Sequence, residues 1–210
     1  MKRLLAMLTA SLMTLVVPAA AQQTLDEIKK QLSSQKSELD EVDALLAQED
    51  KNLRIAAMEL LLKSGNPSFV QRAKETGLFS SDPELQRAAV AAIFEAGGPF
   101  RLVADLTTAP EEKTKAKAWL SYVRGALTVD EKVGTYVFQT GPYDKSKQCW
   151  PFKEGRNCAF TLAGAAISLA EWRGVTGELT LSSDGVLAGA LRSTDFSNTI
   201  PFPVSVSLID

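Results

Sequence analysis

The chain contains no histidine among its 210 residues. Ser-His-Asp and Cys-His mechanisms use an imidazole as the general base, so the sequence excludes both. Zinc and non-haem iron sites built on histidine are excluded for the same reason. The chain also lacks a glycine-rich phosphate loop and a dinucleotide-binding fingerprint. Any catalysis would rest on carboxylates, lysine, tyrosine or serine, and we expect no metal and no cofactor.

Neither positive nor negative charge is in large excess. The chain has 23 basic and 25 acidic side chains, a formal net charge of −2. Loss of Lys2 and Arg3 with the leader described next leaves 21 basic against 25 acidic side chains, a net charge of −4. A mildly acidic protein does not attract nucleic acid or anionic lipid by its overall field. We therefore expect no nucleic-acid partner.

Long apolar runs are confined to the N-terminus. A positive start, an apolar run and a stretch of small residues follow one another at 2–3, 4–17 and 19–21. This order predicts a secretory signal over residues 1–21, cleaved after Ala21, and a periplasmic or secreted mature protein. The run is shorter than the roughly 20 residues that span a bilayer, so we expect no stable membrane insertion after cleavage.

Cysteine is also scarce, with Cys149 and Cys158 as the two examples. In an exported chain, an oxidising compartment makes a disulfide between them the expected state. Because the loop that they close is short, the bond should stabilise the fold by roughly 2–3 kcal/mol. A pair of free or metal-binding thiols is the alternative.

Two stretches of the chain come into register when one is shifted by 32 residues. Leu46 and Asp50 then fall on Leu78 and Asp82. Each stretch carries an apolar stripe at helical spacing, made of Leu53, Ala56, Ala57, Leu60 and Leu61 in the first and of Leu85, Ala88, Ala89, Ala92 and Ile93 in the second. The alanine pairs predict a neighbouring helix that approaches closely.

Capping residues frame the two stretches. Asp82-Pro83 suits a helix start, with aspartate as the N-cap and proline in the first turn. Gly65 and Gly97 stand where a helix end favours a left-handed residue, and a proline follows each two positions later. The unit is a helix, a loop with aspartate, a second helix and a Gly-x-Pro exit.

This unit resembles the HEAT-like α-solenoid repeats over roughly residues 36–125. The resemblance implies a helical repeat domain over 22–128, with a third, degenerate unit formed by helices at 100–106 and 111–127. HEAT-like solenoids offer an extended surface to partner proteins, so the resemblance implies binding rather than catalysis. Its inner surface would carry polar residues of the second helices, namely Arg54, Glu59, Arg87 and Glu95. The alternative is that these side chains are merely solvated.

Apolar residues before the repeats follow a heptad spacing. Leu25, Ile28, Leu32, Gln35, Leu39, Val42 and Leu46 alternate steps of three and four. A long helix that caps the solenoid and leads into the first repeat is the favoured interpretation, and a self-association seam is the alternative.

The remainder of the chain, residues 129–210, has the pattern of an antiparallel β domain. Short β-forming stretches are separated by turn signals, at 133–140, 158–172 (one long strand, or two that meet near Gly164), 176–181, 186–192 and 202–208. Ser183-Asp184-Gly185 is a hairpin signal. We predict an α+β protein in which the HEAT-like segment precedes a small antiparallel β-sandwich or partial barrel.

The segment 142–158 combines aromatic and basic residues in a loop that the cysteines would close. Trp150, Phe152, Lys153 and Arg156 could contact a partner protein, or a glycan stacked on Trp150. Alternatively, the two aromatic residues pack beneath the loop while the cations face water.

The resulting hypothesis is a non-catalytic interaction protein of the cell envelope that binds a protein partner through its helical repeats. Recognition of a glycan or small molecule by the β domain is one alternative, and inhibition of an envelope enzyme by the disulfide loop is another. A hydrolase built on carboxylates is the last, with Glu154, Glu171, Glu178 and Asp184 as its candidates.

Overall fold

The structure is a computed structural model, and it describes residues 24–194 and 200–209. The signal predicted at 1–21 lies outside these residues. By its internal contacts the chain divides into two units, residues 1–37 and 38–210, which are described separately below. The described helices are α1 (Leu25–Leu46), α2 (Lys51–Leu62), α3 (Pro67–Leu78), α4 (Pro83–Glu95) and α5 (Pro110–Val123).

Helix α1 begins in the first unit and ends in the second. It starts with a capping box, because Thr24 N donates to Glu27 Oε2 (2.8 Å) and Glu27 N donates to Thr24 Oγ1 (3.3 Å). Leu25, Ile28 and Leu32, in the first unit, are exposed, whereas the heptad residues Val42 and Leu46, in the second, are buried. One continuous helix therefore carries the whole heptad pattern, and the function of its exposed part stays a prediction.

The 32-residue register recurs in the positions of the helices. Helices α2 and α4 begin at Lys51 and Pro83, and the predicted N-caps hold. The carboxylate of Asp50 accepts from Asn52 N (2.8 Å), and that of Asp82 accepts from Glu84 N (2.9 Å). Gly65 and Gly97, beyond the ends of the two helices, have φ of 72° and 88°, as expected for left-handed residues at these sites.

Helices α2, α3 and α4 pack against one another. They approach closely at Gly77 of α3, where an added Cβ would lie 2.5 Å from both Ala89 Cβ and Met58 Sδ. The apolar stripe predicted for α4 is buried apart from the half-buried Ala88. The stripe predicted for α2 is wrong at Leu53, Ala56 and Leu60, which are exposed.

The helix predicted at 100–106 is wrong, because this segment forms strand β1 (Phe100–Asp105). Phe100, Leu102 and Ala104 are buried and alternate with less buried residues. This period of two suits a strand with one face on the core. The helix predicted at 111–127 is present as α5, which ends at Val123. No third helix pair therefore follows α4 in the described residues.

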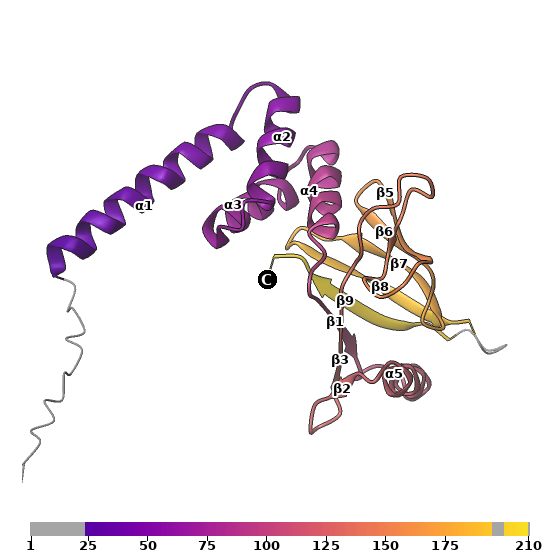
Figure 1. Ribbon diagram of the computed structural model, residues 1–210. Coiled ribbons are helices and arrows are strands. Elements are labelled where there is room, and N and C mark those ends of the chain that lie inside the picture. The colour runs from indigo at the N-terminus through magenta and orange to yellow at the C-terminus, as the bar shows by residue number, and fades with distance from the viewer. Residues whose placement is uncertain (1–23, 195–199, 210) are drawn as a thin grey trace, which may run out of the picture. The chain divides into compact units, whose positions relative to one another are not determined.

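The strands form one antiparallel, curled sheet in the order β2-β3-β1-β9-β8-β7-β6-β5-β4 (Figure 1). Their bounds are Ala126–Leu127 for β2, Val133–Phe138 for β3, Trp150–Pro151 for β4, Cys158–Ala163 for β5, Ala166–Trp172 for β6, Val175–Leu181 for β7, Val186–Ser193 for β8 and Phe202–Ser207 for β9. All predicted strands are present, and the stretch 158–172 is two strands. The sheet has the half-barrel form, the second of the two predicted alternatives.

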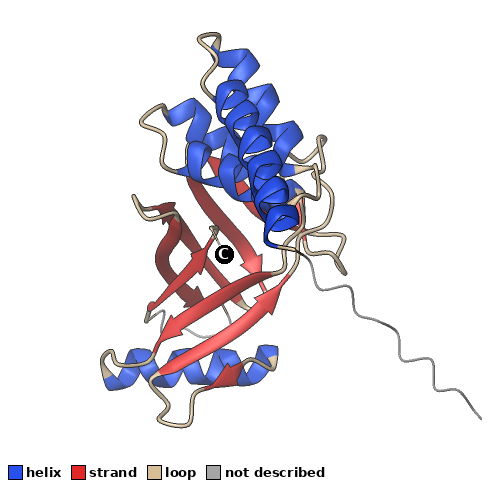
Figure 2. Cartoon of the chain, turned by 90° about the vertical axis from the view of Figure 1, so that its left-hand side faces the viewer, coloured by secondary structure: helices blue, strands red, loops and turns tan. Residues whose placement is uncertain are grey.

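One hydrophobic core joins helices and sheet within residues 38–210. Helices α2–α4 and helix α5 lie at opposite ends of the sheet (Figure 1; Figure 2). At the α4 end, the Phe94 ring lies 5.0 Å from that of Phe100 and 5.7 Å from that of Phe160. At the α5 end, the Trp119 ring lies 5.5 Å from that of Trp172. The helical and β-rich parts of this unit are therefore held together by shared packing.

Candidate binding groove

A groove of about 590 Å³ lies between helices α2 and α4, the loop that precedes β4, and strand β5. Its apolar lining comes from α2, α4, β4 and β5 and consists of Ile55, Ala88, Ala91, Ala92, Trp150 and Leu162. Its polar lining consists of Glu59, Lys63, Glu84, Arg87, Glu95, Tyr143 and Lys145. This volume lies within the range of ligand sites. Polar residues make up about half of the lining, so the groove suits a ligand that has both apolar and polar groups.

Helical spacing explains the walls of the groove. Ile55, Glu59 and Lys63 are four residues apart and therefore lie in one row along α2. On α4, the small side chains of Ala88 and Ala92 leave space opposite this row. The predicted alanine pair thus has two functions, because Ala89 packs beside Gly77 while Ala88 lines the groove.

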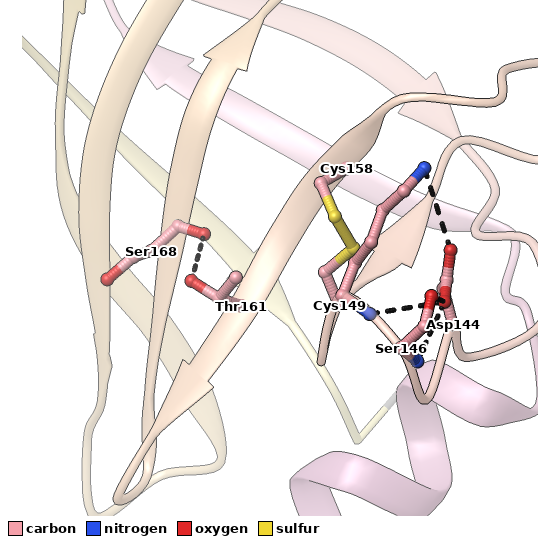
Figure 3. The surroundings of a disulfide bond; sticks show 7 residues. Asp144, Ser146, Cys149, Cys158, Thr161 and Ser168 are labelled. Carbon is pink, nitrogen blue, oxygen red and sulfur yellow. Dashed lines mark hydrogen bonds and ion pairs between the residues drawn. A yellow bond between two sulfur atoms is a disulfide. The ribbon is translucent and has the colours of Figure 1, made fainter.

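The third wall is a loop held in one conformation by covalent and polar contacts. The predicted disulfide between Cys149 and Cys158 is present, with the Cα atoms 5.6 Å apart (Figure 3). Asp144 Oδ1 accepts from Ser146 N (2.9 Å), Ser146 Oγ (2.6 Å) and Lys147 N (3.2 Å). These hydrogen bonds, that of the Ser146 hydroxyl above all, hold the pKa of Asp144 below its usual value.

Trp150 anchors this loop to α4. Its side chain is 3% exposed, and its Nε1 donates to Glu95 Oε2 (3.2 Å). The same carboxylate oxygen accepts from Tyr143 N (3.2 Å), and the Tyr143 and Trp150 rings lie 4.7 Å apart. Trp150 is therefore packed beneath the loop, as in the second sequence interpretation, and does not offer an open face for stacking a sugar.

The other predicted loop residues lie outside the groove. Phe152 is half-buried, stacks on Trp172 with centroids 5.2 Å apart, and has the Arg173 guanidinium 5.2 Å from its own ring centroid. Lys153 is exposed and donates to Gln139 Oε1 (3.1 Å). Arg156 is exposed and lines a cavity of about 140 Å³ beside Phe152. The four loop residues therefore do not form one surface.

The two arginines predicted on the inner helical surface also separate. Arg87 is exposed and lines the groove. Arg54 instead donates to Gln48 O (2.7 Å) and Glu49 O (3.2 Å), so it holds the connection between α1 and α2. Of the six predicted contact residues, the groove thus unites Arg87 and Trp150. It also contains Glu59 and Glu95, which the sequence had indicated as inner polar positions.

Sequence reasoning missed several lining residues, among them Ile55, Lys63, Tyr143 and Leu162, whereas Lys145 lies in the predicted basic loop. The row of Ile55, Glu59 and Lys63 was visible as a spacing of four within a predicted helix. Tyr143 and Leu162 left no such signal, because only the folded loop and sheet bring them opposite the helices.

Some charged side chains around the groove already have partners within the protein, and others are left to contact a ligand. Glu84 pairs with Lys51, and Glu95 accepts the two hydrogen bonds from the loop. The described contacts include no ion pair or side-chain hydrogen bond for the remaining charges, which are those of Glu59, Lys63, Arg87 and Lys145. Glu95 keeps its charge, because both of its donors are neutral, so three cations stand against the two carboxylates of Glu59 and Glu95. This small excess of positive charge favours a ligand that combines apolar groups with negative charge.

The carboxylates considered for hydrolysis are not gathered in this groove. Asp184 accepts from the Ser182 hydroxyl within its hairpin, and Glu178 is exposed on β7. Glu154 lines a separate cavity of about 180 Å³. The Glu171 side chain lies outside the described part of the structure. Within residues 24–194 and 200–209, no three acidic or cysteine side chains are grouped closely enough to hold a metal ion.

No helix in the described part of the chain combines the length and apolar character needed to cross a membrane. Comparisons of the chain with protein-family models, with curated protein sequences and with solved structures found no match.

Proposed function

We propose that the chain is a non-catalytic binding protein, exported by the signal at 1–21, and that its groove holds a segment of a partner protein in the cell envelope. The observation that carries this proposal is the groove itself, with an apolar floor and a charged rim supplied by four separate segments. The 32-residue register of α2 and α4 further supports the HEAT-like interpretation, which implies partner binding.

The chemistry of the groove favours a short peptide segment with apolar and acidic side chains. A volume of about 590 Å³ accommodates a few side chains rather than a whole domain. Ile55, Ala91 and Leu162 would contact the apolar groups. Lys63, Arg87 and Lys145 would attract the acidic groups, chiefly raising the association rate and the selectivity.

The loop wall of the groove is cross-linked and hydrogen-bonded within the chain itself. The disulfide, the Asp144 turn and the hydrogen bond from Trp150 to Glu95 fix the loop against α4. Binding then loses little conformational entropy in this wall, so even a small contact area can give useful affinity.

The proposal is tested by selecting peptides from a displayed library on the oxidised mature protein. Ala91→Trp fills the floor of the groove, and Ala118→Trp on α5 is the matched control, because Ala118 is exposed and far from this lining. We expect selected peptides to bind Ala91→Trp at least tenfold more weakly than Ala118→Trp. Equal affinity for the two variants would contradict the proposal.

Recognition of a small molecule or glycan is the second candidate, because the groove has the volume of a small-molecule site. Calorimetry with peptidoglycan fragments and envelope glycans tests it against the same two variants. Binding of a glycan that Ala91→Trp abolishes, with no peptide selected, would favour this candidate over the first.

A further inference from the structure

The sheet ends at β4, and this last strand covers only part of its neighbour β5. Strand β4 has two residues, which pair with β5 as Trp150 opposite Phe160 and Pro151 opposite Cys158. Beyond Phe160, strand β5 continues through Leu162 to its end, and no strand is paired with this part on the β4 side in the described residues. An uncovered strand edge offers backbone donors and acceptors to another chain.

The hairpin between β5 and β6 determines which backbone groups face this edge. Ala163 and Ala166 are partners across a two-residue turn, in which Gly164 has a φ of 61°. The residues that flank such a turn form a hydrogen-bonded pair, and hydrogen-bonded and non-hydrogen-bonded pairs then alternate along the strands. Leu162 therefore belongs to a non-hydrogen-bonded pair with β6. Its N–H and C=O point away from β6, toward the uncovered edge.

The loop before β4 turns away before it reaches Leu162. The β4–β5 register, continued by two residues, would place Gln148 opposite Leu162, but Gln148 has a φ of 56° and no described pairing with β5. Cys149 instead exchanges hydrogen bonds with Asp144 of its own loop, with N–O distances of 2.8 and 3.3 Å. The disulfide holds Cys149 at the start of β5 (Figure 3). The same contacts that fix the loop thus leave the edge at Leu162 open.

This open edge borders the groove, because the Leu162 side chain is one of the lining groups. Directly opposite residues of an antiparallel pair place their side chains on the same face of the sheet. A residue added opposite Leu162 would therefore direct its side chain into the groove, whose apolar lining includes Ile55 and Ala91. Residues two positions away would also face the groove, and those between them would face the opposite side.

We propose that the partner segment binds as an added antiparallel strand at Leu162, with an apolar side chain opposite Leu162 and an acidic side chain two residues away. This inference rests on the function proposed above and specifies how the segment binds. The antiparallel direction continues that of β4. The acidic side chain follows from the groove's excess of positive charge, which comes from Lys63, Arg87 and Lys145. Backbone pairing of this kind gives affinity, and the alternate side chains give specificity.

An N-methyl scan of a library-selected peptide tests the binding mode from the side of the ligand. Each N-methylation removes one backbone donor and leaves every side chain in place. We expect methylation of one central residue, the one opposite Leu162, to weaken binding at least tenfold. Methylation of either direct neighbour, whose N–H points away from β5, should weaken it less than threefold. A scan without this alternation would overturn strand addition.

Leu162→Pro tests the same edge in the protein. Proline lacks the N–H, and a strand edge tolerates it where that N–H faces outward. Leu162→Ala is the matched control, because it also loses the leucine side chain but keeps the N–H. We expect Leu162→Pro to bind the selected peptide at least fivefold more weakly than Leu162→Ala, with both circular dichroism spectra unchanged. Equal affinity of the two folded variants would contradict the proposal.

Amide hydrogen exchange tests the edge in the unmodified protein. In the free protein the Leu162 amide should exchange faster than that of Thr161, which faces Ser168 in a hydrogen-bonded pair. The selected peptide should slow exchange at Leu162 at least tenfold and leave Thr161 unchanged. A peptide that Ala91→Trp weakens but that does not protect Leu162 would overturn strand addition and leave the proposed function in place. Selection of no peptide at all would overturn both.

Discussion

Helices α2 and α4 begin 32 residues apart with the same aspartate cap, yet they occupy different surroundings. Leu85 is buried in α4, while the equivalent Leu53 is exposed in α2. Both helices carry the same apolar stripe, so the sequence pattern indicates which face can be buried. Whether that face is buried depends on a neighbouring element. The second pair has one on this side, and the first pair offers its stripe to solvent or to another molecule.

The largest effect is expected where the pairs differ most in packing. Gly77→Leu gives the second pair the residue that the first has at Leu45. Its Cβ would lie 2.5 Å from Ala89 Cβ and Met58 Sδ, so we expect the free energy of unfolding to fall by about 3 kcal/mol or more. Urea denaturation measures this, and Leu45→Gly is the reciprocal variant, with an expected cost of about 1 kcal/mol. Equal costs would contradict the packing difference.

Truncation of the two matched leucines should give the next largest contrast. Leu85→Ala removes a buried side chain, and we expect a loss of about 3 kcal/mol in the free energy of unfolding. Leu53→Ala removes an exposed one and should change it by less than about 0.5 kcal/mol. Urea denaturation at a few micromolar protein measures both variants. Similar losses in both variants would mean that α2 is covered in solution.

Glu95 and Lys63 are also equivalent by the 32-residue shift, and only Glu95 holds the loop. Glu95→Ala leaves the buried Trp150 N–H without its acceptor, so the free energy of unfolding should fall by about 1–2 kcal/mol. Lys63→Ala should change it by less than about 0.5 kcal/mol at the same dilution. The loss from Glu95→Ala should shrink in a Trp150→Phe background, which lacks the indole donor and keeps only the hydrogen bond from Tyr143 N. An undiminished loss there would mean that the hydrogen bond contributes little.

The smallest effect concerns the charge of the α4 cap. The hydrogen bond from Glu84 N, with a further contribution from Lys51, lowers the pKa of Asp82. A lowered pKa stabilises the fold above the unfolded value of about 3.9, and this contribution disappears as pH falls through the folded value. Asp82→Asn keeps a capping side chain and removes only the charge. It should therefore lower the melting temperature slightly at pH 6, where Asp82 is ionised, and have no effect at pH 2.5, where that contribution is lost. A pH-independent difference would contradict this assignment.

Much of the fold follows from local patterns that the sequence contains. Asp50 and Asp82 cap helices as predicted, and the Cys149–Cys158 bond is present. The 32-residue register predicts a helix at 100–106, but this segment forms strand β1. The buried Phe100, Leu102 and Ala104 alternate with the exposed Arg101 and Asp105, which is a strand pattern. Val103 interrupts the polar side of this alternation, so the sequence signal is incomplete.

The groove was harder to predict than the elements that form it. Arg87 and Glu59 were expected on one helical surface, and both line the groove. Trp150 lines it too, but as a buried anchor bonded to Glu95 rather than as an open platform. That contact joins residues 55 positions apart, and no local pattern specifies it. Arg54 was misplaced for the same reason, since its guanidinium satisfies carbonyls of a loop.

The three tryptophans provide the most direct test of the groove. Trp150 lines it, whereas Trp119 and Trp172 lie in the packing around α5 and β6. Nitrogen-15 NMR resolves one indole N–H signal for each. Titration with a library-selected peptide should shift the Trp150 signal in a saturable way and leave the Trp119 signal in place. A bound peptide that leaves the Trp150 signal unmoved, or shifts that of Trp119 instead, would contradict the assignment of the groove as the binding site.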